Sequence, residues 1–275
     1  MSWMCPVCNE ELNIVDNQWR CVNGHSFDRA KEGYVNLLLA QQKKSKQPGD
    51  NKEMVLARRQ FLSEDHYQPL ALAIAEQIAM GFSSNMPFRL HDLGCGEGYY
   101  LRVIEQQLMK QAINGVLSGN DISKVAIQKA AKQCQTIDWS VASSFQLPLS
   151  DGSVDAVLQV FAPVSAKENA RVVKSGGWWF QVEPEADHLM ELKQALYRSP
   201  EEHKVAVQQS SEFTLVEQQE LKFSLRLEQQ EHRLALLKMT PYYWRVPEDG
   251  LSRVIEAMSE VTAHFYIRSY QRTAD

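Results

Sequence analysis

The sequence predicts an α/β protein with a doubly wound, mostly parallel sheet and a small zinc-binding module at its N-terminus. From residue 88 onward, strand-like apolar segments alternate with helical segments. This rhythm is typical of a parallel sheet that is covered by helices. Three of the five cysteines lie within the first 21 residues. A segment this short buries too little apolar surface to fold without a metal.

Length and composition limit the class of protein. The chain has 275 residues, which fits one large and one small domain. It carries 29 Lys and Arg against 34 Asp and Glu, and 44% of its residues are apolar, which excludes wholesale disorder. No apolar run reaches the ~18 residues that cross a bilayer, and the N-terminus lacks the pattern of a signal peptide. We therefore expect a cytoplasmic protein without a membrane partner.

The N-terminal segment has the spacing of a zinc site. Cys5 and Cys8 are separated by two residues, and Cys21 and His25 follow as a second pair. Thiolate and imidazole ligands at this spacing can surround one tetrahedral ion. The protein fills all four positions and leaves no place for water, so we expect one structural Zn²⁺ per chain. An odd number of cysteines argues against a disulfide framework.

The elements of the large domain follow in order. Helical spacing is expected over residues 52–61 and again over 69–80, just ahead of the first strand. The later helices are expected at 99–110 and 124–133. A last strand pair within 213–227 and 263–272 would close the sheet in antiparallel fashion. The strands of the parallel part are expected at 88–93, 115–120, 139–142, 154–161 and 178–182.

A glycine-rich loop joins the first strand of this sheet to the next helix. Asp92 is followed by glycines at the alternate positions Gly94, Gly96 and Gly98. A dinucleotide-binding loop would need its third glycine at position 99, where this chain has Tyr99. The pattern instead resembles the S-adenosylmethionine loop of the seven-stranded, Rossmann-like class I methyltransferases. In that reading, the backbone passes under the ligand and Asp92 orients the loop or the methionyl ammonium.

Residues at the ends of the next three strands complete this expected cofactor site. Asp121, followed by Ile122, ends the second strand, where a carboxylate can accept hydrogen bonds from both ribose hydroxyls. Ala142 and Ser143 end the third strand, where the adenine edge would lie. Phe161 follows the fourth strand, beside the methyl group that would be transferred.

Longer segments point to one family. They are CPVC, CVNGHSFDRAKEGYVNLL, PGDNKEMVLARRQFL, DLGCGEGYY, SKVAIQKAAK, HLMELK and MTPYYWR. Together they resemble the bacterial 23S ribosomal RNA (guanine-N1)-methyltransferases, which are zinc-containing class I enzymes, over nearly the whole chain. The resemblance implies methyl transfer from S-adenosylmethionine to N1 of a guanine in 23S ribosomal RNA, with the zinc module helping RNA recognition. It also implies that Cys5, Cys8, Cys21 and His25 bind zinc and that Tyr67, Gly96, Glu97 and His188 contact the cofactor.

The substrate restricts the chemistry that the protein must supply. N1 of guanine carries a proton at neutral pH, so we expect a general base. The chain lacks the Asn-Pro-Pro-Tyr loop of exocyclic-amine methyltransferases after its fourth strand, and it lacks the Pro-Cys nucleophile of cytosine-C5 enzymes. No single residue is identified as the base. The candidates after the fifth strand are Glu183, Glu185, Asp187 and His188.

We expect three segments: a zinc-binding module over residues 1–36, a basic linker over 37–60 and a methyltransferase domain over 61–275. The linker carries a surplus of Lys and Arg that fits either a solvated connection or a phosphate-binding strip. Two alternatives to an RNA methyltransferase are a methyltransferase of a small metabolite and a non-catalytic, zinc-dependent RNA-binding protein. A homodimer is compatible with the sequence.

Overall fold

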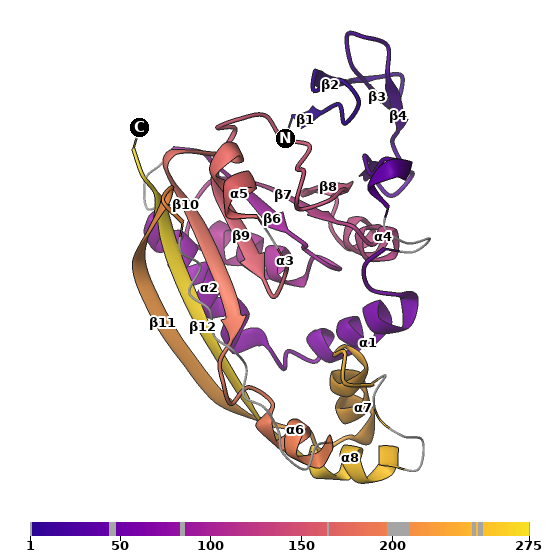
Figure 1. Cartoon of the computed structure of the whole chain (residues 1–275), viewed down its shortest axis with the longest axis vertical. Helices are drawn as coiled ribbons and strands as arrows, with labels where there is room; N and C mark the ends of the chain where they lie inside the picture. The colour runs from indigo at the N-terminus through magenta and orange to yellow at the C-terminus, as the bar shows by residue number, and fades with distance from the viewer. Residues whose placement is uncertain are drawn as a thin grey trace.

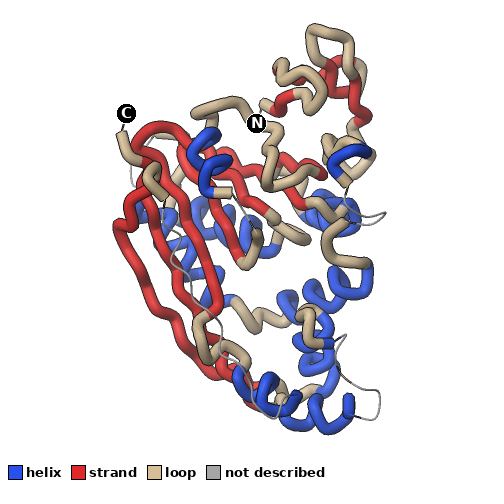
Figure 2. Tube along the Cα trace, in the orientation of Figure 1, coloured by secondary structure: helices blue, strands red, loops and turns tan. Residues whose placement is uncertain are grey.

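The computed structural model describes residues 2–43, 48–82, 86–163, 165–196, 210–243, 246 and 250–274. Two sheets organise the chain (Figure 1). A small antiparallel sheet lies at the N-terminal end, and an eight-stranded sheet forms the body of the protein. Short helices gather at the opposite end of the molecule from the small sheet (Figure 2).

The small sheet has the strand order β1-β2-β3-β4 and is antiparallel throughout. The tight turn between β2 and β3 places Asp16 and Asn17 in the left-handed region, which Asn and Asp adopt more readily than most residues. The strands are β1 (Trp3–Met4), β2 (Glu11–Val15), β3 (Gln18–Arg20) and β4 (Ser26–Asp28).

The large sheet has the order β11-β12-β10-β9-β6-β7-β8-β5. β12 is antiparallel to both of its neighbours, and the other pairs are parallel. The strands are β5 (Val35–Asn36), β6 (Phe88–Leu93), β7 (Gly115–Asp121), β8 (Asp138–Val141), β9 (Val154–Val160), β10 (Val173–Pro184), β11 (Phe213–Arg226) and β12 (Glu260–Arg272).

The expected α/β class and its antiparallel closing pair are confirmed. β5 was not predicted, because two residues are too short to show strand periodicity. It is formed by the last two residues of the segment expected as the zinc module, and it joins the edge of the large sheet beside β8. β10 begins earlier than expected and includes Gly176 and Gly177, where its register against β9 shifts.

The helices are α1 (Lys52–Ser63), α2 (Gln68–Gly81), α3 (Tyr99–Lys110), α4 (Lys124–Gln133), α5 (Ala166–Val172), α6 (Met190–Leu196), α7 (Gln230–Lys238) and α8 (Leu251–Ala257). The Asn51 side chain caps α1 by accepting a hydrogen bond from the Met54 amide. α1 packs against α7, from the far end of the sequence (Figure 1). Among the described helices, none combines the length and apolarity needed to span a membrane.

The zinc module is anchored to the large sheet through Trp3. This side chain is 1% exposed and meets the ring of His91 edge to face, with centroids 5.9 Å apart. The Met4 amide also donates a hydrogen bond to the Pro148 carbonyl at 2.9 Å. Trp3 shares one apolar core with residues of the sheet and α5, such as Leu93 and Val172. The module therefore packs directly on the large domain.

His91 lies wholly inside the protein and predicts a pH dependence of stability. Its Nδ1 lies 2.8 Å from Ser118 Oγ and its Nε2 lies 3.0 Å from Asn120 Oδ1. Burial lowers the pKa of His91 from 6.5 to about 4, although the bond to Asn120 acts in the opposite direction. Below pH 6.5 the unfolded chain therefore binds a proton that the native protein rejects.

We expect the free energy of unfolding to fall by up to about 3 kcal/mol from His91 alone between pH 6.5 and about 4. Urea denaturation of the parent protein and of His91→Gln over this range measures the difference. The variant should show a shallower decline. Equal slopes for the two proteins would contradict the prediction.

Candidate functional site

A pocket of about 350 Å³ opens where β6, β7 and β9 end. This edge is where ligands bind in doubly wound sheets. Its wall is built from the β6–α3 loop, the ends of neighbouring strands and parts of α1 and the segment after α7. Among the residues in the wall are Asp50, Arg58, Tyr67, Asp92, Gly94, Gly96, Glu97, Asp121, Ile122, Ser143, Phe145, Phe161, Ala162 and Met239.

The β6–α3 loop requires its glycines for two different reasons. Gly94, Gly96 and Gly98 all have positive φ, at +71°, +58° and +80°. A Cβ on Gly94 would lie 2.7 Å from Ala162 Cβ, and one on Gly98 would lie 2.6 Å from the Trp139 ring. A Cβ on Gly96 would meet no atom of the described residues within 4 Å, and it would stand in the pocket wall. Two glycines thus permit protein packing, and Gly96 keeps open a space beside the loop.

Two carboxylates lie beside this loop, Asp92 buried and Asp121 partly buried. Asp121 accepts hydrogen bonds from the Gly96 amide at 3.0 Å and from the Ser123 amide at 2.7 Å, which fixes its orientation. Asp92 is 1% exposed, and its Oδ1 has no hydrogen-bond partner among the residues that the structure describes. Burial raises the pKa of Asp92, and the nearby charge of Asp121 raises it further. The pocket therefore holds an acceptor that lacks a donor.

Other expected cofactor residues share this pocket. Tyr67 is 2% exposed and packs edge to face on Phe61 and Phe265. Ile122, Ser143 and Phe161 also lie in the wall. Glu97 lies there as well, but Arg102 and Gln133 hydrogen-bond its two carboxylate oxygens, at 3.4 and 2.7 Å. Its side chain is thus held by the protein.

Three expected cofactor residues are absent from the wall. Gly98 lies behind it and precedes α3. The Ala142 carbonyl accepts a hydrogen bond from the Asn120 side chain, and Ala142 lines a neighbouring cavity beside the zinc module. His188 Nδ1 accepts from the His264 amide at 3.2 Å, and its ring packs on Phe265, which in turn packs on Tyr67.

The sequence did not identify Asp50, Arg58, Phe145 or Met239 as parts of this wall. Arg58 forms an ion pair with Asp50, so this arginine of the expected basic linker points into the pocket wall. Lys44 and Lys46 of the linker lie outside the described residues. The only available signal was the conspicuous run of basic and acidic residues around Arg58.

The pocket fits S-adenosylmethionine. Asp121 retains lone pairs for a ribose diol, and the orphaned Asp92 Oδ1 matches the ammonium of an amino acid. The Gly96 space admits a ligand against the backbone. All three residues line the pocket at the carboxyl edge of the sheet.

Gly96→Ala tests the space beside the loop. The new methyl would occupy ligand space, so we expect S-adenosylhomocysteine affinity to fall about 10- to 100-fold. Gly152→Ala is the matched control because Gly152 also has a positive φ, +55°, with no atom near its Cβ position, and lies outside the pocket wall. Thermal denaturation should show a similar decrease in melting temperature for both variants. Calorimetric titration should show a loss of S-adenosylhomocysteine affinity only for Gly96→Ala. Equal affinities would contradict the assignment.

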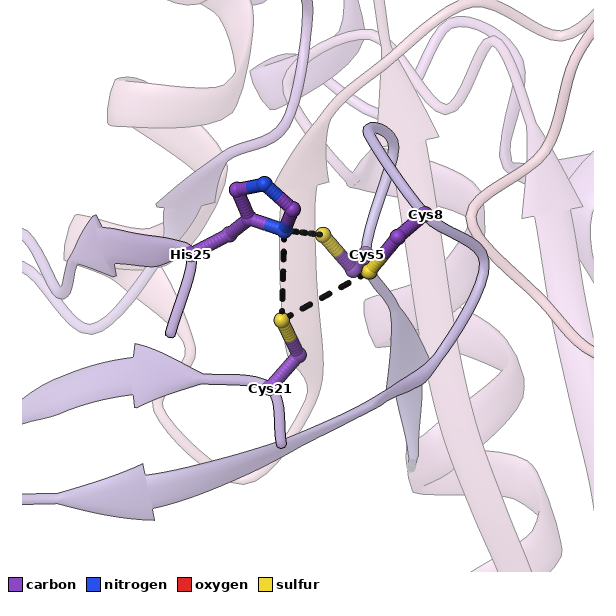
Figure 3. Close-up of side chains that lie close together, drawn as sticks. All are labelled: Cys5, Cys8, Cys21 and His25. Atoms are coloured by element: carbon purple, nitrogen blue, oxygen red, sulfur yellow. Dashed lines mark hydrogen bonds between the residues drawn. The ribbon is translucent and has the colours of Figure 1, made fainter. Parts of the chain in front are cut away.

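The second candidate site is the cluster of Cys5, Cys8, Cys21 and His25 (Figure 3). Cys8 Sγ lies 3.6 Å from Cys21 Sγ, and His25 Nδ1 lies 3.6 Å from Cys5 Sγ and 3.4 Å from Cys21 Sγ. A tetrahedral zinc ion with bonds of about 2.3 Å to sulfur and 2.0–2.1 Å to nitrogen requires ligand atoms about 3.5–3.8 Å apart. These three distances agree with this spacing, and all four ligand atoms lie within 4.8 Å of one another.

Two tight turns hold the ligand pairs. The Asn9 amide donates to the Cys5 carbonyl at 2.8 Å, and the Gly24 amide donates to the Cys21 carbonyl at 3.0 Å. Gly24 has φ of +82°, which glycine adopts at no steric cost. A hydrogen bond from the Asn23 side chain leads the effects that lower the pKa of Cys8 to about 6, which favours the thiolate that zinc requires.

The four candidate bases differ in their surroundings. Glu183 accepts a hydrogen bond from Arg268, a residue 1% exposed, at 2.8 Å. Asp187 pairs with both Lys222 and His264. His188 is engaged by the His264 amide. Glu185 is different, because its Oε2 is buried without a hydrogen-bond partner in the part of the chain described.

Comparison with known proteins identifies the family of this chain. Residues 3–46 match the zinc-ribbon family described as RlmA, N-terminal, and residues 91–177 match the methyltransferase domain family. A 23S rRNA (guanine(748)-N(1))-methyltransferase of Streptomyces fradiae is 35% identical over 91% of this chain and 89% of its own length. The YxjB protein of Bacillus subtilis (strain 168), with a provisional name of the same kind, is 33% identical over 93% and 91%. The chain therefore belongs to the family of zinc-ribbon, S-adenosylmethionine-dependent 23S rRNA (guanine-N1)-methyltransferases.

Proposed function

We propose that this protein transfers a methyl group from S-adenosylmethionine to N1 of one guanine in 23S ribosomal RNA. The observation that carries the proposal is the near full-length similarity to the Streptomyces fradiae enzyme, which includes both the zinc ribbon and the cofactor loop. A metabolite methyltransferase would have no use for the ribbon family. A non-catalytic protein would have no use for a pocket that fits the cofactor.

The pocket would hold the cofactor through four contacts of this chain. Asp121 binds the ribose diol, Asp92 binds the ammonium, Gly96 admits the backbone contact and Ser143 borders the adenine. The cofactor supplies an electrophilic methyl group. The protein's part is to align the guanine with that group, exclude water and remove the N1 proton.

Glu185 is the general base in this proposal. The Phe161 amide donates to the Val182 carbonyl at 3.2 Å, so the end of β10 lies beside the Phe161 segment of the pocket wall. Glu185 follows that strand end, and one of its carboxylate oxygens is buried and accepts no hydrogen bond from any residue that the structure describes. Its three rivals are committed to other partners.

We propose that three segments divide the work. Residues 1–36 form the zinc module and recognise RNA, residues 37–60 connect it, and residues 61–275 perform the chemistry. The connecting segment also includes much of α1, which brings Arg58 to the pocket. The aromatic residues of the MTPYYWR segment are candidates for stacking on an exposed RNA base. Tyr242 and Tyr243 pack against the apolar core, which favours a structural role for them, and Trp244 lies outside the described residues. A cytoplasmic enzyme fits this substrate, and sedimentation of the pure protein decides between monomer and homodimer.

The decisive experiment is incubation of the pure protein with labelled cofactor and unmodified 23S ribosomal RNA. A methyl group on N1 blocks the Watson–Crick edge of guanine, so primer extension should stop at one guanine. We expect label in RNA and a single new stop. Label in small molecules alone, or in protein alone, would refute the RNA substrate.

A further inference from the structure

Arg58 is the one basic side chain that the described residues contribute to the wall of the cofactor pocket. Four carboxylates share that wall, at Asp50, Asp92, Glu97 and Asp121. Arg58 is partly shielded, with 31% of its side chain exposed. We propose that its guanidinium binds the carboxylate of the methionine part of S-adenosylmethionine and so positions the cofactor.

The charges of the ligand leave one requirement, which Arg58 alone meets among the described residues of the pocket wall. The methionine part carries an ammonium, a sulfonium and a carboxylate. Asp121 and Asp92 suit the ribose and the ammonium, as argued above. A ligand carboxylate would be repelled by both acids unless a cation lies beside it. Guanidinium binds a carboxylate through paired hydrogen bonds, so it is suited to this role.

The structure already shows Arg58 holding a carboxylate at the pocket. Its Nη1 bonds Asp50 Oδ2, and its Nη2 lies 3.5 Å from the Met239 carbonyl oxygen. Asp50 is fixed in turn, because the Ser123 hydroxyl donates to its carbonyl at 2.9 Å. Asp50 therefore occupies the position of a surrogate anion, and cofactor binding would exchange one carboxylate for another.

Electrostatics agree with this location. Burial raises the pKa of Asp121, and among the nearby charges Asp50 raises it further while Arg58 lowers it. Burial also raises the pKa of Tyr100 in the first turn of α3, and Arg58 opposes that effect too. The positive charge of Arg58 therefore acts on both Asp121 and Tyr100, at the end of β7 and the start of α3.

The test compares two ligands that differ in the amino-acid part. S-adenosylhomocysteine has the carboxylate, whereas 5′-methylthioadenosine keeps the nucleoside and lacks it. For Arg58→Gln we expect about a 10- to 100-fold loss of S-adenosylhomocysteine affinity by calorimetry and unchanged 5′-methylthioadenosine affinity. Arg59→Gln, next on the same helix but absent from the pocket wall, is the matched control and should bind both ligands normally.

The outcomes separate the inference from a structural role. Unchanged S-adenosylhomocysteine affinity in Arg58→Gln, or equal losses for the two ligands, would overturn it. Asp50→Asn removes the competing anion and should bind S-adenosylhomocysteine at least as tightly as the parent. If Asp50→Asn lost affinity for both S-adenosylhomocysteine and 5′-methylthioadenosine, the ion pair would be needed for the shape of the pocket. That result would also overturn the inference. Because only binding is measured, the result is independent of which substrate receives the methyl group.

Discussion

Replacement of Glu185 by Gln is expected to lower the rate of RNA methylation by about 10²- to 10⁴-fold, the usual contribution of a general base. The amide keeps the shape of the side chain and cannot accept the N1 proton. Because Glu185 lies outside the cofactor-pocket wall, S-adenosylhomocysteine affinity should not change. Single-turnover rates with 23S ribosomal RNA and calorimetric titration of the same preparation measure the two quantities.

The neighbouring Glu183→Gln is the informative control. Glu183 pairs with Arg268, which is almost fully buried, so its loss leaves a charge without its partner. We expect Glu183→Gln to act mainly on stability. Its melting temperature should fall, while its methylation rate per folded molecule should change much less than that of Glu185→Gln. A parent-like rate in Glu185→Gln would assign the proton transfer to another group.

Local patterns made the sheet and the zinc site predictable from the sequence. Apolar residues recur with a characteristic period over several residues within each strand and each helix, so these elements can be identified from the sequence. The zinc ligands form two short pairs, and the close approach of His25 to Cys5 and Cys21 follows from their spacing. Asp121 was predictable because the end of a parallel strand places its side chain at the ligand edge.

The other pocket residues could not be predicted because distant segments bring them together. Arg58 and Met239 are 181 positions apart, and only the packing of α1 on α7 joins them. The hydrogen-bond partners of Glu97 and His188 could not be predicted from the sequence either. Glu97 is hydrogen-bonded by Gln133 of α4, and His188 is held by the His264 amide of β12. Family resemblance identifies such positions without revealing these bonds.

Removal of zinc is expected to abolish RNA methylation while cofactor binding survives. Zinc binding contributes about 10–16 kcal/mol of folding free energy in small zinc modules, so the metal-free ribbon should unfold. No residue of 2–43 lies in the wall of the cofactor pocket. Trp3 and Trp19 are 1% and 8% exposed, so their fluorescence should shift to longer wavelength when the ribbon opens.

Two substitutions at the cluster distinguish the metal from the side chains that bind it. Cys21→Ser should reproduce the effect of chelation, because serine is a poor zinc ligand at neutral pH. His25→Cys supplies the four thiolates of another common structural zinc site and should retain both zinc and methylation. Full methylation activity of the zinc-free protein would show that the folded zinc ribbon is not needed for RNA recognition. Loss of S-adenosylhomocysteine binding would instead mean that the contact of Trp3 with His91 supports the pocket, since His91 directly precedes Asp92 in β6.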